Sequence, residues 1–93
     1  MVSVKIVLFA TLRSKYRARE LIVTCDGTFL NLVENASKIL GREFIADVYD
    51  NNKGKVRDDK IIMVNGRNIK DLKREITLKD NDVIAIFPPL AGG

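Results

Sequence analysis

The fold of this chain is decided by the segment TFLNLVENASKILG, residues 28–41. Its apolar side chains recur at helical spacing and form a single stripe, made of Phe29, Leu32, Val33, Ala36, Ile39 and Leu40. Thr28 suits the N-cap because its hydroxyl can accept from an unpaired amide of the first turn, and Gly41 suits the left-handed position after the helix. We therefore predict a helix over about 29–40 whose stripe packs on a second layer.

Two strands are predicted before this helix. The first covers residues 2–9, where β-branched and aromatic side chains are frequent and every even position is apolar. The even face of this strand should therefore point to the core. The second strand covers residues 20–24, and the polar residues 11–19 between the two strands are predicted to be the long turn of an antiparallel hairpin.

Shorter elements are predicted after the helix. Asn65-Gly66 is a strong hairpin signal, because both residue types tolerate positive φ. The expected order is a helix or a strand over 43–49, a turn at 50–54, a strand over 60–64, a brief return strand opening at Ile69, a turn at 78–82 and a last strand over 83–87.

This order predicts an α+β protein with two layers. A single main helix must bury its stripe on one face of a sheet, here a mixed sheet of four to five strands. A hairpin, a helix and a returning strand make the β-grasp (ubiquitin-like) arrangement, in which the first and last strands lie parallel at the centre. We expect one domain over residues 1–87 and an extended C-terminal tail over 88–93.

Composition excludes several classes of function. The chain has 93 residues, no histidine and one cysteine, so neither a zinc site nor Ser-His-Asp or Cys-His catalysis can be assembled and no metal is expected. The single cysteine, Cys25, should pack as a small apolar residue. No apolar run approaches the roughly 20 residues that span a bilayer, and no signal peptide is evident, which predicts a cytoplasmic protein without a membrane partner.

The charge balance leaves a binding function open. The chain has a formal net charge of +4 and a pI near 9.4, which is compatible with nucleic-acid binding. However, the basic residues are spread along the whole chain and aromatic residues are few. An acidic protein partner explains the charge at least as well, and a nucleic-acid-binding module is kept only as a rival hypothesis.

The chain closes with Pro88-Pro89-Leu90-Ala91-Gly92-Gly93. The prolines lack amide donors and have a restricted φ, so they should end the sheet and hold the tail extended. Six residues can reach roughly 20 Å from the domain. Because Ala91, Gly92 and Gly93 have almost no side chain, the tail can enter a narrow channel in a partner and present its carboxylate there. The alternative is that the two glycines are only a frayed end.

The tail resembles that of a known family. The closing FPPLAGG (87–93), the opening LFATLR (8–13), VNG (64–66) and LKDNDV (78–83) are similar to the MoaD family, the small subunit of molybdopterin synthase. The similarity spans nearly the whole chain, and the closing motif is the most distinctive part. The segment 50–59 departs from the family pattern and leaves the structure of 43–59 undefined.

The resemblance implies a sulfur carrier that is not an enzyme on its own and binds no cofactor. A ubiquitin-activating-type enzyme would use ATP to adenylate Gly93, a sulfur donor would convert it to a thiocarboxylate, and the large synthase subunit (MoaE-like) would use that sulfur to build molybdopterin. The alternatives are a ubiquitin-like modifier conjugated to lysines through Gly93, or a sulfur carrier for tRNA thiolation or thiamin synthesis.

Strand alternation predicts a docking surface. If the even positions of the first strand face the helix, Phe9 faces the other way, as does Phe87 in the last strand. The two rings should lie together on the open face beside the root of the tail, where Ile69 would join them and Arg13 would contact an acidic partner. The alternative is that the segment 11–19 folds over both rings and buries them.

Overall fold

The computed structural model describes residues 1–71 and 76–88 of the chain. The five strands of its main sheet are β1 (Val2–Leu8), β2 (Glu20–Cys25), β5 (Ile61–Val64), β6 (Arg67–Asn68) and β7 (Val83–Phe87). A separate two-stranded ladder joins β3 (Tyr49–Asp50) to β4 (Lys55–Val56). The helices are α1 (Ala10–Tyr16), α2 (Phe29–Leu40), α3 (Glu43–Val48) and the 3₁₀ helix η1 (Ile69–Asp71).

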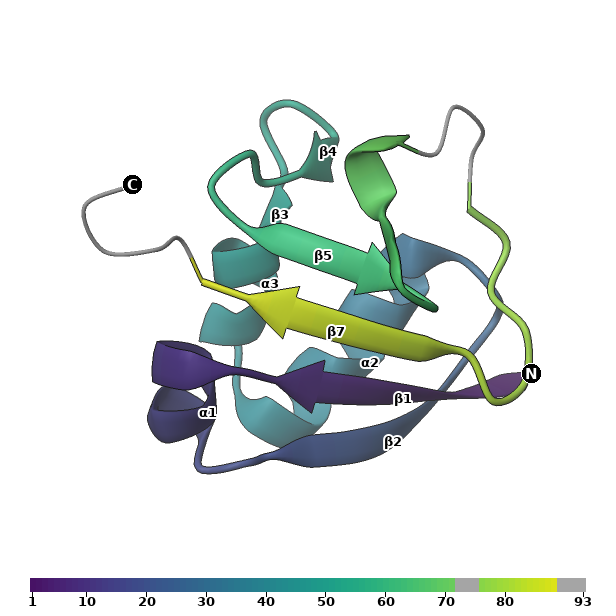
Figure 1. Cartoon of the computed structure of the whole chain (residues 1–93), viewed down its shortest axis with the longest axis horizontal. Coiled ribbons are helices and arrows are strands. Elements are labelled where there is room, and N and C mark those ends of the chain that lie inside the picture. The colour runs from purple at the N-terminus through teal and green to yellow at the C-terminus, as the bar shows by residue number, and fades with distance from the viewer. Residues whose placement is uncertain (72–75, 89–93) are drawn as a thin grey trace.

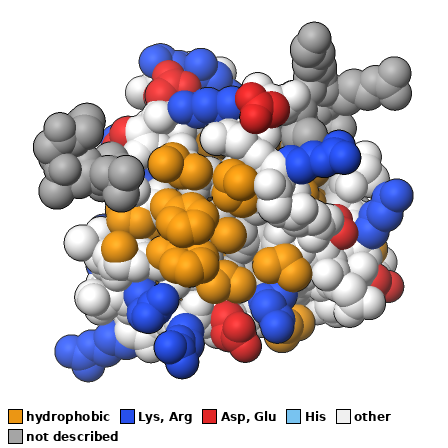
Figure 2. Space-filling model, in the orientation of Figure 1, with side chains coloured by type: hydrophobic (Ala, Val, Ile, Leu, Met, Phe, Trp, Pro, Cys, Tyr) orange, Lys and Arg blue, Asp and Glu red, His pale blue; other side chains and the backbone are white. Residues whose placement is uncertain are grey.

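The main sheet has the order β2-β1-β7-β5-β6, and α2 and α3 lie behind it in the view of Figure 1. β1 and β7 are parallel neighbours at the centre, with Ile6 opposite Ile84 and Leu8 opposite Ile86. The predicted β-grasp arrangement is therefore confirmed. The opposite face of the sheet, turned to the reader in Figures 1 and 2, is not covered by a helix within the described residues.

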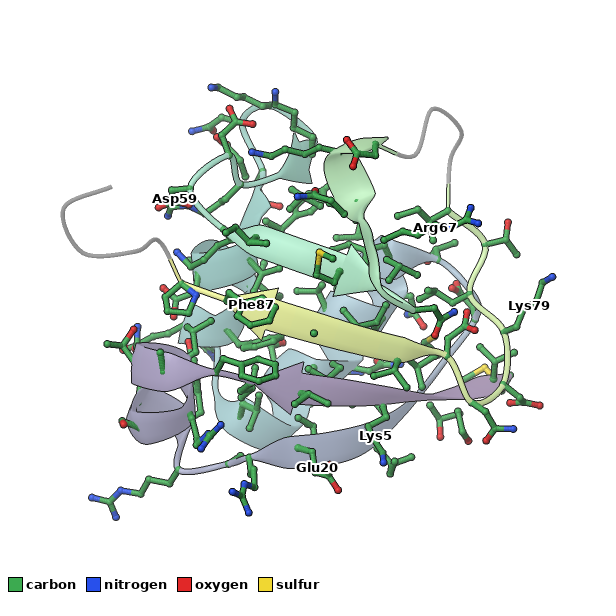
Figure 3. The ribbon with its side chains drawn as sticks, viewed as in Figure 1. Lys5, Glu20, Asp59, Arg67, Lys79 and Phe87 are labelled. Atoms are coloured by element: carbon green, nitrogen blue, oxygen red, sulfur yellow. The ribbon has the colours of Figure 1, made fainter. Side chains whose placement is uncertain are left out.

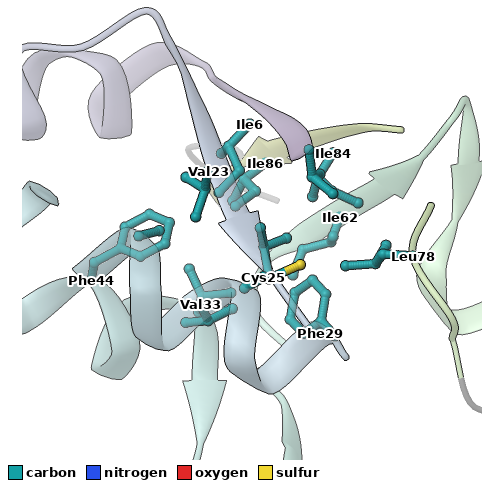
Figure 4. Packing of buried hydrophobic residues seen from close by; sticks show 14 of the residues in the cluster. Ile6, Val23, Cys25, Phe29, Val33, Phe44, Ile62, Leu78, Ile84 and Ile86 are labelled. Carbon is teal, nitrogen blue, oxygen red and sulfur yellow. The ribbon is translucent and has the colours of Figure 1, made fainter. Parts of the chain in front are cut away.

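The core lies between the sheet and α2. The even side chains of β1, Val4, Ile6 and Leu8, are buried, as the alternation predicts. They belong to one core cluster with the buried face of α2 and with Phe44. Figure 4 shows Ile6, Val33 and Phe44 in this cluster. Cys25 is fully buried in the same cluster, which agrees with its predicted role as a small apolar residue.

The helix predicted over 29–40 is α2, with the same bounds. Thr28 is its N-cap, since the Thr28 hydroxyl accepts from the Asn31 amide at 3.2 Å. Gly41 has a positive φ of 119°, but its ψ of 156° is extended, so the predicted left-handed helical conformation is wrong. Ile39 is also misplaced in the predicted stripe, because it is 62% exposed at the margin of the buried face.

The Thr28 cap provides a test of this local structure. Asp26 accepts from both the amide and the hydroxyl of Thr28, at 2.9 and 2.7 Å, and so orients the cap. Thr28→Ala should lower the free energy of unfolding by about 1 kcal/mol, because the Asn31 amide loses its partner. Urea denaturation checks this. Thr28→Ser keeps the hydroxyl and should restore most of the loss, and equal loss in both variants would contradict the capping role.

Two segments differ from the prediction, and a third resolves the alternative of a helix or a strand over 43–49. The segment 11–19 is not a simple turn: α1 occupies most of it, because Leu12 and Tyr16, one helical turn apart, pack against the core. Residues 43–48 form a helix, with Phe44 and Val48 fully buried at the same spacing. The return strand is limited to β6, and Ile69 opens η1 instead of a strand.

Candidate functional site

The open face of the sheet carries an apolar patch. Five of its members come from strand positions that point away from α2 and are neighbours in the register of β1, β7 and β5, and the sixth, Phe9, directly follows β1. We define the apolar patch as Val7, Phe9, Ile61, Met63, Ala85 and Phe87. Figure 2 shows it as a continuous hydrophobic surface, and monomeric proteins rarely leave such a surface exposed without a function.

Two aromatic rings form the centre of the apolar patch. Phe9 and Phe87 stack with their centroids 4.2 Å apart and their planes 12° from parallel. Both side chains are half-buried, so α1 flanks the rings without covering them. The Phe9 amide also donates to the Ile86 carbonyl at 3.2 Å, which ties the end of β1 to β7. This is the juxtaposition that alternation predicts; the docking role of the two rings stays a prediction.

Arg13 lies at the edge of the apolar patch. Its guanidinium carbon is 5.9 Å from the centroid of the Phe9 ring, within the range of a cation–π contact. Its Nε also donates to the Leu8 carbonyl at 3.4 Å. α1 therefore places one exposed positive charge directly beside the aromatic pair.

Ile69 does not belong to the apolar patch. It lines a hollow on the helix side of the domain together with Phe29, Val56 and Ile76. The physical reason is the register of the β5–β6 hairpin: Asn68 pairs with Met63, which is on the open face, so the next residue, Ile69, falls on the same face as the buried Ile62. The sequence interpretation also missed Ile61 and Met63. They alternate with the buried Ile62 and Val64 along β5, and this alternation could have indicated that they face away from the core.

The predicted tail begins at the end of β7, where Phe87 lies opposite Ile61 (Figure 3). Pro88, the first residue of the predicted tail, is buried. The remaining tail residues, Pro89, Leu90, Ala91, Gly92 and Gly93, lie outside the described residues, so their predicted roles are taken up below as a proposal. What the structure describes is the root of the tail, and that root adjoins the apolar patch.

A polar cluster joins α1 to α3. The Asp47 carboxylate accepts from Lys15 Nζ at 2.8 Å and from the Tyr16 hydroxyl, and Lys15 also lies 3.4 Å from Glu43. The Tyr16 ring packs edge-on against Phe44, with centroids 5.4 Å apart. Burial, with help from Asp47, raises the pKa of the Tyr16 hydroxyl, which therefore stays a donor. This cluster holds α1 against the domain and so positions the element that carries Arg13.

Asp47 should make stability depend on pH. Burial alone would raise the pKa of this carboxyl, but the hydrogen bonds from Lys15 and Tyr16 outweigh it and lower the pKa below its ordinary value. A lowered pKa stabilises the folded state above the unfolded value and loses this contribution as the pH falls through the folded value. Asp47→Asn should therefore lower the free energy of unfolding at pH 7 by about 1 kcal/mol, and Tm with it. It should also make the decline of Tm below pH 4 less steep.

Thermal unfolding measured between pH 7 and pH 2 checks the role of Asp47. Asp80→Asn is a useful control, because Asp80 is an exposed carboxylate that accepts from the Ser3 amide at 2.8 Å, far from α1. A parallel loss in Asp47→Asn at all pH values, with no change in the acid limb, would contradict the assignment of the charge to Asp47.

A second group of charges lies at the start of β5, in the part of Figure 3 that labels Asp59. Arg57 donates to both Asp59 oxygens, at 3.0 and 2.9 Å, and Lys60 lies 3.5 Å from the same carboxylate. Lys60 is 8% exposed, so its charge is held close to the domain. Over residues 1–71 and 76–88, no group of three or more acidic or cysteine side chains is arranged to hold a metal ion, and no helix is long and apolar enough to cross a membrane.

The sequence profile described as the ThiS family matches residues 6–93 of this chain. No curated protein matches this chain in sequence. The match covers the last three residues of β1, the other four strands of the main sheet, both rings of the apolar patch and the closing glycines.

Solved structures share the fold. The small archaeal modifier protein 1 of Methanosarcina acetivorans is 28% identical, with a TM-score of 0.80 and coverage of 100% of this chain and 98% of its own. A protein assigned as subunit 1 of molybdopterin converting factor from Pyrococcus furiosus is 29% identical, with a TM-score of 0.66 and coverage of 97% and 100%. The BexX/CysO complex of Amycolatopsis orientalis contains a chain that is 20% identical, with a TM-score of 0.80 and coverage of 97% and 99%.

Proposed function

This chain belongs to the ThiS family, a group of small, non-catalytic sulfur carriers with a ubiquitin-like fold, and from that premise we propose that it carries sulfur on Gly93 as a thiocarboxylate. The observation that supports this most directly is the extent of the family match, which runs through the closing Gly92-Gly93. The root of the tail beside an exposed apolar patch supports it further. The protein supplies the reacting group, and a partner enzyme supplies the catalysis.

The proposed chemistry begins with an unreactive carboxylate. An oxygen of the Gly93 carboxylate attacks the α-phosphorus of ATP, and pyrophosphate leaves. The resulting acyl-adenylate is electrophilic at the carbonyl carbon. A sulfide-equivalent nucleophile from a sulfur donor then attacks this carbon, the bond to AMP breaks, and a thiocarboxylate and AMP result. Glycine suits this position because no Cβ crowds the carbon that is attacked.

The apolar patch is the proposed docking surface for the activating enzyme. Phe9 and Phe87 are half-buried and stacked, so they present a preformed aromatic surface with little entropy left to lose. Arg13 beside them would meet an acidic group of the partner and increase the association rate. A complex that contains a chain of the same fold, BexX/CysO, supports the expectation of a protein partner.

We propose molybdopterin synthesis as the destination of the sulfur. The closing FPPLAGG and the 29% identity to the Pyrococcus furiosus protein support this pathway. The partners would then be an adenylating enzyme of the ubiquitin-activating type, a sulfur donor and a large synthase subunit, all in the cytoplasm. Thiamin synthesis and tRNA thiolation use the same activated tail and are the alternative destinations.

A second candidate function has specific support. The modifier protein of Methanosarcina acetivorans is 28% identical over the full chain. In a modifier, a lysine amine of a target protein attacks the same acyl carbon, AMP leaves, and an isopeptide bond forms. Both functions require the adenylated Gly93, so they differ only in the nucleophile that follows.

Mass spectrometry of the protein isolated from its native cell distinguishes these candidates. Replacement of one C-terminal oxygen by sulfur is expected if the chain is a carrier. Gly93 joined to lysines of other proteins is expected if it is a modifier. Loss of molybdenum-enzyme activity on deletion of the gene, restored by the full chain but not by one ending at Ala91, would assign the pathway. A free carboxylate in all conditions, with full complementation by the truncated chain, would refute the sulfur-carrier proposal.

A further inference from the structure

β2 forms one edge of the main sheet, and in Figure 1 no element lies beyond it among the described residues. The Leu8 amide donates to the Arg19 carbonyl at 2.9 Å, which identifies Leu8 and Arg19 as a hydrogen-bonded pair. Because such pairs alternate in an antiparallel ladder, the backbone groups of Leu21, Val23 and Cys25 also point to β1. Those of Glu20, Ile22 and Thr24 point outward, away from the sheet.

One half of this edge is already covered by α2. Asn35 Nδ2 donates to the Thr24 carbonyl at 2.8 Å, and the Asp26 amide donates to Asn31 Oδ1 at 2.9 Å. No hydrogen bond within the described part of the chain uses the outward backbone groups of Glu20 or Ile22. The N-terminal half of β2 therefore remains a short, unpaired strand edge, which is a template for strand addition.

Exposed apolar side chains flank this uncovered half on both sides. Ile22, on the open face of the sheet, is 60% exposed. Ile39, on the α2 side, is 62% exposed and lies one helical turn beyond Asn35 on the same helix face. Since Asn35 reaches Thr24 and the two elements run in opposite directions, Ile39 lies at the level of the uncovered half. A strand added here would place alternate side chains against one isoleucine and then the other.

The charges around the edge select the kind of strand. Arg19 leads into β2, and Lys38 precedes Ile39 on α2. Glu20, the one acidic side chain of β2, lies 3.9 Å from Lys5, so these two charges offset each other and the net charge at the edge is that of Arg19 and Lys38. A second copy of this chain would bring the same positive charges together, so self-association at this edge is disfavoured.

We propose that the β2 edge binds an extended, acidic and β-branched segment of a partner protein as an additional strand. This mode supplies affinity through backbone hydrogen bonds and selectivity through alternate side chains. The surface lies on an edge strand, whereas the root of the tail follows the central strand β7, so a partner strand on β2 would leave the root of the tail uncovered.

The test uses the peptide Asp-Glu-Ile-Thr-Val-Thr-Val-Asp-Glu and the full chain labelled for NMR. Saturable shifts of the Glu20, Ile22 and Thr24 amides are expected, with slower hydrogen exchange at Ile22. N-methylation of alternate peptide amides should weaken binding about tenfold or more, because the ladder hydrogen bonds are lost. Replacing the acidic residues of the peptide by lysine should weaken it similarly at low salt.

Variants of the chain locate the site. Ile22→Pro removes an outward amide but no bond to β1, so it should block binding with the sheet intact. Ile39→Ser should weaken binding, whereas Leu30→Ser, on another face of α2 and 40% exposed, should not. If Ile22→Pro fails to fold, the comparison of Ile39→Ser with Leu30→Ser and the binding of the methylated peptide still test the proposal. Shifts centred on Phe9 and Phe87, equal binding of the methylated peptide, or no binding would overturn the proposal.

Discussion

A variant with two alanines appended after Gly93 is expected to fold like the natural chain and to receive no sulfur. Under the proposed mechanism the reacting group is the terminal carboxylate of Gly93. The appended residues convert this carboxylate into a peptide amide. An amide oxygen of Gly93 cannot be adenylated, and a new carboxylate would lie two residues too far along the channel. The loss should be complete rather than partial, because it removes the reacting group itself.

Incubation with the activating enzyme, ATP and a sulfur source, followed by mass spectrometry, measures this loss. The matched control carries the same two alanines before Met1, which is 83% exposed and far in sequence from the tail. That control should be loaded normally, and both variants should show the same Tm. Sulfur transfer to the C-terminally extended chain would reject Gly93 as the acceptor.

Phe87→Glu is expected to weaken binding to the activating enzyme about 30- to 1,000-fold, which is the range of a loss of about 2–4 kcal/mol at an interface hot spot. Phe87 is half-exposed at the centre of the apolar patch and stacks on Phe9 at 4.2 Å. The substitution removes the aromatic pair and places a charge where the partner would have to desolvate it. The domain should stay folded, because the ring points away from the core.

Isothermal titration calorimetry with the activating enzyme measures this effect, and circular dichroism checks the fold. Leu30→Glu is the matched control: it places the same charge at an exposed leucine of α2, away from the apolar patch. Phe87→Leu keeps an apolar side chain and should lose less affinity than Phe87→Glu. Unchanged affinity in Phe87→Glu would show that the partner binds elsewhere on the domain.

The two experiments separate docking from chemistry. The extended tail should leave the apolar patch free to bind, so that the adenylation rate falls while much of the affinity remains. Phe87→Glu leaves Gly93 intact, so a raised KM with a smaller change in kcat is expected. If both variants lost affinity and rate together, tail entry and patch contact would be one inseparable binding event.

Much of the fold could be predicted because its main signals are local. The stripe and caps of residues 28–41 specify α2, and the alternation in β1 and β7 specifies which side chains face the core. From those two strands the neighbouring positions of Phe9 and Phe87 also follow, since parallel central strands bring equivalent positions together.

Other features depend on contacts between distant segments. α1 was expected to be part of a turn, because its stripe has only Leu12 and Tyr16 and gains its stability from Phe44 and Asp47, about 30 residues away. Ile69 is predicted on the open face, but the pairing of Met63 with Asn68 puts the next residue of the chain on the helix side. Strand alternation alone does not specify this register, which depends on how β6 pairs with β5.

The sequence by itself determined the β-grasp order of elements, the faces of the central strands and a closing motif with a chemically distinctive end. Only the tertiary structure decided that α1 flanks the aromatic pair without burying it, that Ile39 is exposed, and that α2 covers one half of the β2 edge but not the other. The physical reason is range. Side-chain periodicity records which face of an element is apolar, whereas exposure and free backbone groups depend on how far neighbouring elements extend over that face.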